Sequence, residues 1–252
     1  DELHPFLIVF YRSLFGLIII VPLFLKDRSV FISAYKYLHF VRAFLKICAL
    51  TSFFLAIKFV ALSDVTAISF ITPILIILGS ILFLNEKPHR MHILFASIGF
   101  VGIIIILKPG QSIIPLAIYW AVIGAVLSAF IQLILKKMSS KDSSSTLVVW
   151  NLLCTVPLAF IPACFFWVVP SFELFILLSI QGIIGVLNMA LMTKAMSLSD
   201  VSYLAPYDFL RLPIISILAF MFFDEIPELS TLIGALIIFM SSFLISNLAK
   251  NK

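Results

Sequence analysis

The sequence has little charge and little glycine. Only 12% of its 252 residues are Asp, Glu, Lys or Arg, about half the usual share in a soluble domain, whereas 63% are apolar. This composition excludes a soluble globular protein and indicates a polytopic membrane protein. With 9 glycines against 26 phenylalanines, lipid-facing helices fit better than barrel strands, which would alternate apolar and polar residues. We therefore expect an all-α membrane fold.

Sequence motifs of several enzyme classes are also absent. There is no His-Glu-x-x-His, no Gly-x-Ser-x-Gly and no Cys-x-x-Cys, and a membrane-embedded enzyme is kept only as an alternative. Without an ATP-binding loop, an ion gradient, a solute gradient or exchange must supply the energy for any transport. The three cysteines lie inside apolar segments and are interpreted as small buried hydrophobes. We expect no cofactor and no metal.

Nine apolar segments are long enough to cross a bilayer, which takes about 20 residues. They span residues 6–25, 40–62, 65–84, 92–107, 114–135, 145–168, 172–196, 201–223 and 229–248. No connection between them is long enough to form a soluble domain. The most polar connection, residues 136–145, divides the chain near its middle.

The basic residues sit in the short loops between these segments. The net charge is +5, but charges placed in this way set topology and do not form a nucleic-acid surface. When the loops are taken alternately, the basic residues of one side are Lys26, Arg28, Lys36, Lys87, Arg90, Lys136, Lys137, Lys141, Lys250 and Lys252. The opposite side has Lys108 and the acidic run 224–228. The positive-inside rule therefore places the C-terminus in the cytoplasm and the N-terminus of this chain outside.

An internal repeat is visible in the sequence. Residues 58–65, Lys-Phe-Val-Ala-Leu-Ser-Asp-Val, match residues 194–201, Lys-Ala-Met-Ser-Leu-Ser-Asp-Val, and a proline-bearing apolar segment and an acidic turn follow each. We expect two repeats, at 1–107 and 114–248. The segment 114–135 lacks a partner, which a helix preceding this chain would supply, giving five helices per repeat. Because five is odd, the repeats are expected to be inverted, as in many secondary transporters.

The pattern resembles the EamA family of the drug/metabolite transporter superfamily over nearly the whole chain. The resemblance rests on the two repeat units, the glycine- and isoleucine-rich segment 99–107, the Ala205-Pro206 element and the turns Leu84-Asn85-Glu86 and Asp224-Glu225. It implies ten helices with both termini cytoplasmic. The family turn usually ends in Gly-Glu or Asn-Glu, so Asp224 departs from it. We expect Glu86 and Glu225 to cap or brace their turns.

Three runs resemble the bacterial S-adenosylmethionine uptake carriers of this family in particular. They are Ala205-Pro206-Tyr207, residues 225–234 and the opening residues 4–12. Related carriers move amino acids, sugars, nucleotides and drugs. The resemblance therefore implies a small organic substrate, with S-adenosylmethionine as the best candidate, and an exporter of amino acids or drugs is the alternative within the same fold.

Asp208 and Arg211 lie near the middle of segment 201–223, whose two prolines are expected to break its helix. A charge at that depth costs roughly 2.5–3.5 kcal/mol on insertion scales and normally faces a bundle interior or a wet cavity. The two can neutralise each other, since they are three residues apart, or they can offer opposite charges to a solute. Tyr203 and Tyr207 precede Arg211 at steps of four residues, where their rings can hold a base or a sulfonium. We favour substrate binding.

Four further residues have both structural and functional interpretations. Arg12 can line a site or extend to the membrane surface, and Asn188 is a buried amide that can bridge helices or contact substrate. Arg42 and Lys46 are one turn apart near the cytoplasmic end of segment 40–62 and repel each other slightly unless an anion bridges them. We expect Arg42 to extend to the lipid headgroups, and we keep Lys46 as a candidate carboxylate-binding group.

The leading hypothesis is a secondary transporter of the bacterial inner membrane that moves a small organic metabolite by alternating access. Its expected substrate-binding residues are Arg12, Lys46, Asn188, Tyr203, Tyr207, Asp208 and Arg211. The charged members would engage the ammonium and carboxylate of S-adenosylmethionine, and the tyrosines its adenine or sulfonium. The expected partners are the lipid bilayer and this metabolite, without nucleic acid, and the oligomeric state is not predicted.

Overall fold

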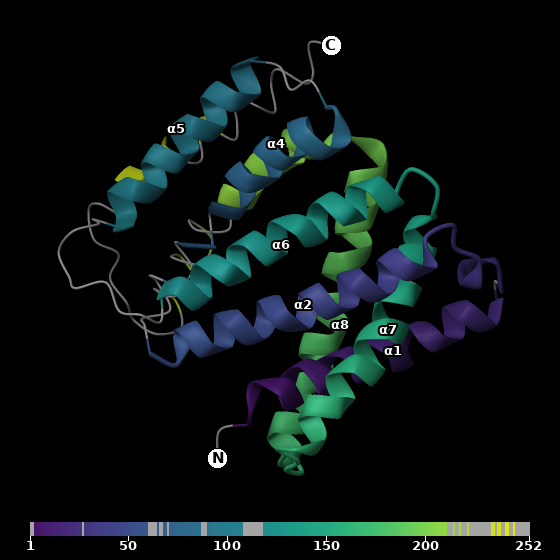
Figure 1. The fold of residues 1–252 in the computed structure, drawn as a ribbon. Helices are drawn as coiled ribbons and strands as arrows, with labels where there is room; N and C mark the ends of the chain where they lie inside the picture. The colour runs from purple at the N-terminus through teal and green to yellow at the C-terminus, as the bar shows by residue number, and fades with distance from the viewer. Residues whose placement is uncertain are drawn as a thin grey trace. The chain divides into compact units, whose positions relative to one another are not determined.

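A computed structural model shows the regular secondary structure of the chain as helices. It describes residues 3–26, 28–59, 65, 68–69, 71–86, 90–107, 118–210, 214, 217, 221, 233–234, 236–237, 240–241 and 244. The elements in these ranges are α1 (Pro5–Lys26), the 3-10 helix η1 (Arg28–Phe31), α2 (Lys36–Ile57), α4 (Ile71–Leu84), α5 (Arg90–Leu107), α6 (Ile118–Met138), α7 (Ser144–Cys164), α8 (Phe172–Leu198), α9 (Val201–Leu204) and the 3-10 helix η2 (Ala205–Leu210) (Figure 1). The all-α prediction is confirmed for this part of the chain.

Five of the described helices are long and apolar enough to cross a membrane, judged by length and composition. These spans are Pro5–Pro22, Lys36–Ile57, Tyr119–Met138, Ser144–Cys164 and Phe172–Leu198. The helices α4 and α5 are apolar but shorter over their described residues. The last two predicted segments are described only to Leu210 and at scattered positions beyond it. The count of nine membrane helices therefore stays a prediction.

The chain divides into two compact units that do not follow its linear order. Unit 1 comprises Asp1–Phe54 and Phe130–Leu198, and unit 2 comprises Leu55–Ala129 and Ser199–Lys252. Unit 1 takes one stretch from each of the two predicted sequence repeats, whereas the first stretch of unit 2 runs from the first predicted repeat into the second. The division into repeats at 1–107 and 114–248 is a pattern along the sequence, and it stays a prediction.

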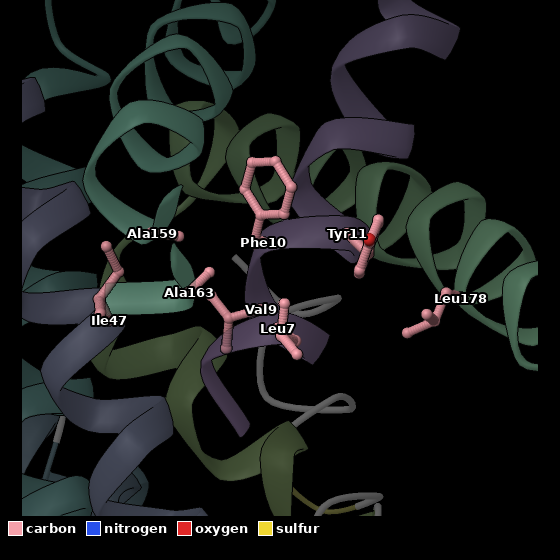
Figure 2. Close-up of a cluster of buried hydrophobic side chains, with 8 residues drawn as sticks. All are labelled: Leu7, Val9, Phe10, Tyr11, Ile47, Ala159, Ala163 and Leu178. Atoms are coloured by element: carbon pink, nitrogen blue, oxygen red, sulfur yellow. The ribbon is translucent and has the colours of Figure 1, made fainter. Parts of the chain in front are cut away.

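The core of unit 1 lies where α1 packs against α7 and α8. Figure 2 shows its main cluster, to which α1 contributes half of the side chains: Leu7, Val9, Phe10, Tyr11, Ile47, Ala159, Ala163 and Leu178. A second cluster, of Ile20, Val30, Val148, Val149 and Leu152, joins α1, η1 and α7. Apolar side chains on several faces of α1 are therefore buried in protein.

Two glycines let α1 and α8 approach each other closely. A Cβ atom added to Gly182 would lie 2.9 Å from the Cβ of Phe15, 3.0 Å from the carbonyl oxygen of Arg12 and 3.1 Å from the backbone nitrogen of Gly16. Two of these three neighbours are backbone atoms, which cannot move aside as a side chain can. Small residues commonly allow this kind of backbone approach between membrane helices.

In unit 2, the turn after α4 holds the start of α9. Asn85 has a φ of 53°, the left-handed conformation in which many helices end, and the Glu86 N–H donates to the Ser80 carbonyl oxygen at 3.2 Å. The Glu86 carboxylate then accepts the Val201 N–H at 3.1 Å. The prediction that Glu86 braces a turn is confirmed.

The segment that follows changes helix type at a proline. The α-helical turn α9 ends at Leu204, and the 3-10 helix η2 begins at Ala205. Pro206 has no N–H to donate to the carbonyl of Ser202, so a regular α-helix cannot continue through this point. The predicted break is thus present at the first proline. The second, Pro213, lies outside the described residues.

Candidate functional site

Two cations of α2 bond to α7 within unit 1. Arg42 Nη2 donates to the Leu147 carbonyl oxygen at 3.1 Å, and Lys46 Nζ donates to Asn151 Oδ1 at 3.0 Å. Because Arg42 and Lys46 are one helical turn apart, both side chains meet the first turns of the same neighbouring helix. Both acceptors are neutral, so these bonds orient the two cations without cancelling their charge.

Arg42 is buried in protein, and its predicted extension to the lipid headgroups is wrong. Its exposed fraction is 2%, because α7 lies close enough to offer the Leu147 carbonyl as a partner. Nη1 of the same guanidinium has no hydrogen-bond partner among the described residues. Leaving a buried donor unpaired costs about 1–3 kcal/mol, and more when the group is charged. Nη1 of Arg42 is therefore a buried donor whose desolvation costs free energy. Within this part of the chain, only a ligand or water can accept its hydrogen bond.

The acceptor for Lys46 is fixed by its own helix. Asn151 is 2% exposed, and its backbone carbonyl oxygen accepts the Thr155 hydroxyl at 2.6 Å. Further along the same surface, Trp150 Nε1 donates to the Phe31 carbonyl at 3.3 Å. The start of α7 is set by Ser143, whose side chain accepts the Thr146 N–H at 3.1 Å, as N-caps commonly do. These bonds fix the part of α7 whose backbone carries the Asn151 side chain.

Arg12 brings a third cation to this region from α1. Gly185 of α8 leaves the room for it, because a Cβ there would lie 3.1 Å from Arg12 Nε and 3.3 Å from Nη2. The Lys46 ammonium lies within electrostatic reach of both Arg12 and Arg42. Arg12 and Lys46 are half-buried, unlike Arg42. The structure thus brings two residues of the predicted site together and adds Arg42 to them.

This cation cluster, defined as Arg12, Arg42 and Lys46, has no acidic partner in the described part of the chain. The ion pair recorded there is between His39 and Asp142. Like charges at 4 Å repel by about 4 kcal/mol at the effective dielectric constant near a protein surface, and less at greater distance. A carboxylate or phosphate group would offset that repulsion and accept charge-assisted hydrogen bonds.

A second polar group surrounds Asp142, which is 6% exposed. Its carboxylate accepts the Ser33 hydroxyl and the Ala34 N–H at 2.9 Å, and it lies 3.2 Å from Nε2 of the fully buried His39. Ser33 Oγ lies 3.0 Å from the same imidazole nitrogen. A hydrolase triad needs the hydroxyl and the carboxylate on opposite ring nitrogens, so this group is a structural clamp and not a nucleophilic centre.

The remaining predicted site residues are placed differently. Tyr207 and Asp208 are half-buried on η2 in unit 2. The side chain of Tyr203 and all of Arg211 lie outside the described residues. Asn188, which we expected to be buried, is exposed on α8. It lies six residues beyond Gly182, about 240° around the helix, and therefore faces away from the contact with α1.

The described residues contain no group of three or more His, Cys, Asp or Glu side chains placed to hold a metal ion. Cys48, Cys154 and Cys164 are free.

Sequence reasoning missed the role of Arg42 and the contact of Asn151 with Lys46. The one-turn spacing of Arg42 and Lys46 was the available signal, because it raised the possibility of a bridging anion. No pattern within α2 or α7 could show which residues of the two helices meet. That depends on packing between stretches about 105 positions apart, as the sequence separation of the Lys46–Asn151 bond records.

Comparison with known proteins gives a consistent family match. The EamA-like transporter family matches residues 1–108 and 115–247. An S-adenosylmethionine uptake transporter of Rickettsia bellii is 30% identical over 246 residues, covering 97% of this chain and 84% of that protein. A riboflavin transporter of Vibrio cholerae is 30% identical over 205 residues, covering 81% and 69%. A pseudopaline exporter of Pseudomonas aeruginosa is 26% identical over 250 residues, covering 96% and 86%.

The fold also has a counterpart among solved structures. One crystal structure superposes with a TM-score of 0.83 and covers 98% of this chain and 90% of its own chain. The sequence identity is 17%, so this likeness concerns the fold alone.

Proposed function

We propose that this chain, which belongs to the EamA-like transporter family, is a secondary transporter that moves a small organic metabolite across a bacterial inner membrane by alternating access. Family membership makes it a multi-pass membrane transporter and not an enzyme. The observation that carries the proposal is the cation cluster, in which charged groups of apolar helices have neutral partners. Such charges are expensive in a membrane and commonly mark a substrate pathway.

The proposed mechanism uses two inverted repeats, at residues 1–107 and 114–248, with the C-terminus in the cytoplasm. Inverted repeats in transporters commonly rock about a site near the middle of the membrane, and the loop charges support the orientation. A reporter protein active only in the cytoplasm, fused after Lys252, tests the topology. Activity is expected, and an inactive but stably expressed fusion would reverse the proposed orientation.

The substrate-binding residues we propose fall into two groups. Arg12, Lys46 and Asn188 belong to unit 1, where Arg12 and Lys46 share the cation cluster. Tyr203, Tyr207, Asp208 and Arg211 belong to unit 2. The first group would receive an anionic part of the substrate. The second would offer aromatic rings and an acidic group to an aromatic or cationic part.

S-adenosylmethionine is the substrate we propose. It combines a carboxylate with an ammonium, a sulfonium and an adenine, which the two groups of side chains suit. The resemblance over nearly the whole chain to a transporter named for its uptake supports this choice. The similarity to a riboflavin transporter makes riboflavin the competing substrate of the same fold.

Uptake of radiolabelled compound into cells expressing the full-length protein tests the substrate. We expect accumulation of S-adenosylmethionine above cells carrying the empty vector, and no effect of excess unlabelled riboflavin. Uptake of riboflavin alone, or of neither compound, would reject S-adenosylmethionine. If uptake is seen, Arg211→Ala should abolish it at equal expression, and intact transport by that variant would remove Arg211 from the site.

Export is the second candidate, favoured by the similarity to a pseudopaline exporter. The direction can be measured with the purified protein in vesicles of known orientation, loaded on one side with labelled substrate. Net flux from the cytoplasmic to the opposite face, with a physiological gradient imposed, would identify an exporter.

A further inference from the structure

We propose that Arg12, Arg42 and Lys46 form a carboxylate-binding subsite of unit 1 in which Arg42 is the anchoring donor. The inference rests on the proposed transport function, because it names the chemical group of a substrate that unit 1 receives. It adds Arg42 to the site and makes the carboxylate a requirement for binding.

The guanidinium of Arg42 is only partly used by the protein. Nη2 donates to the Leu147 carbonyl, whereas Nη1 is buried without a partner in the described ranges. Arginine carries five N–H donors in a rigid fork, and carboxylates are its usual bidentate partner. A side chain needed only to hold one carbonyl would not require a second buried donor with nothing to bind. The unused donor is therefore assigned to a ligand.

Lys46 has a partner that an anion can replace or join. Its bond to the Asn151 amide at 3.0 Å holds the ammonium in place next to α7 but leaves its charge in full. A carboxylate oxygen is a stronger acceptor for an ammonium than an amide oxygen is. Lys46 and Arg12 are half-buried, so part of each side chain is not covered by protein, whereas Arg42 has an exposed fraction of 2%.

Gly185 acts on the subsite through Arg12. A Cβ at this position would lie 3.1 Å from Arg12 Nε, closer than most side-chain contacts, so the guanidinium would have to move. Gly185 is thus a positioning residue that permits Arg12 to lie against α8. Its substitution should change anion binding without removing any charge.

The first test measures the anion site without any transported substrate. Thermal unfolding of the purified full chain in detergent is followed while sodium acetate replaces sodium chloride at constant ionic strength, with acetamide as the uncharged analogue. Acetate should raise the midpoint saturably by about 2–4 °C, and acetamide should not. An acetate effect no larger than that of acetamide would overturn the proposal. A larger effect from inorganic phosphate than from acetate would also overturn it, because the ligand class would then be phosphate.

Variants assign the effect to the cluster. Arg42→Gln and Lys46→Gln should each remove the acetate-dependent rise, whereas Lys36→Gln, an exposed lysine of the same helix, should keep it. If Arg42→Gln does not fold, Arg42→Lys takes its place, because it keeps the charge but loses the fork and should weaken the response. A response unchanged in the folded Arg42 and Lys46 variants would reject the assignment.

Two compounds that differ in the carboxylate then test the subsite separately from the identity of the substrate. Decarboxylated S-adenosylmethionine keeps the adenosine, sulfonium and amine but lacks the carboxylate, and should compete about 10- to 100-fold less well for uptake than S-adenosylmethionine. Equal competition would overturn the subsite while leaving the transport function standing. An acetate response without any S-adenosylmethionine uptake would reject the substrate and keep the subsite.

Discussion

The two compact units differ in the hydrogen bonds that join distant stretches of their chain. In unit 1, charged or strongly polar side chains meet across stretches of chain more than 100 positions apart, as Lys46 does with Asn151 and His39 with Asp142. Two bonds between distant stretches of unit 2 run from a side chain to a backbone group. Glu86 accepts the Val201 N–H, and Thr72 donates to the Ala125 carbonyl at 3.2 Å.

The two kinds of bond differ in how much stability a substitution should cost. A side chain bonded to a backbone group can be replaced at modest cost, because one ordinary hydrogen bond contributes about 1 kcal/mol. Buried charges with partners from another stretch are more demanding, since the loss of either partner leaves the other desolvated and unpaired. In unit 1, these bonds between side chains are therefore where we expect substitutions to cost the most stability.

Asp142→Ala should have the largest effect on folding. It removes the acceptor that Ser33, Ala34 and His39 share, at an expected cost of about 3 kcal/mol or more. Thermal unfolding in detergent measures the loss of stability, and Asp142→Asn should lose less stability than Asp142→Ala. The control is Ser140→Ala, an exposed position expected to change stability by less than about 0.5 kcal/mol. Equal midpoints for Asp142→Ala and wild type would show that the clamp contributes nothing.

Gly182→Ala should have the second largest effect, a loss of about 2 kcal/mol in the free energy of unfolding. The new methyl group would meet the Arg12 carbonyl oxygen at 3.0 Å and the Gly16 nitrogen at 3.1 Å, so α1 and α8 would have to separate. Gly185→Ala is the matched control, because the atoms nearest to its added Cβ belong to the Arg12 side chain, which can move. If both variants unfold at the same temperature, the close approach of the backbones is not what limits this contact.

Glu86→Ala should cost about 1 kcal/mol, the usual value of a helix N-cap interaction. The effect should be local, since the lost bond is to the Val201 N–H. Amide hydrogen exchange of the peptide containing Val201 should speed up, while exchange in α7 should not change. Glu86→Gln keeps an acceptor oxygen and should retain most of the protection. Faster exchange throughout unit 1 would contradict the assignment of this bond to unit 2 alone.

Asn85→Gly should have the smallest effect, below about 0.5 kcal/mol. The φ of 53° at this position is one that asparagine tolerates and glycine adopts freely. Thermal unfolding should therefore leave the midpoint almost unchanged. A clear loss of stability would mean that the Asn85 side chain, and not its backbone conformation, holds the turn.

The sequence predicted much of the fold because hydropathy and turn chemistry are local. It placed α1, α2, α7 and α8 close to their observed bounds and anticipated the bracing role of Glu86. It also predicted the break at Pro206, since a missing N–H acts on its own helix. The helix bounds and the break at Pro206 depend on residues within about one segment length of each other, whereas the Glu86 carboxylate bonds to Val201, 115 positions away.

The candidate site was only half predictable, because its geometry is set by contacts between distant stretches. Arg42 was expected at the lipid headgroups, since nothing in α2 shows that α7 will cover it. Asn188 was expected to be buried, since its helix is apolar all round and gives no sign of which face meets α1. The connection 136–145 was taken as a polar divider, although Asp142 within it is almost fully buried.

The long separation of these bonds has a consequence in time. Arg42 and Lys46 find their partners 105 residues later in the chain, and synthesis at roughly 5–20 residues per second takes about 5–20 s to reach them. During that interval α2 has emerged from the ribosome with two cations that its own half of the protein does not satisfy. A nascent chain that stops before α7 therefore lacks the acceptors that Leu147 and Asn151 provide.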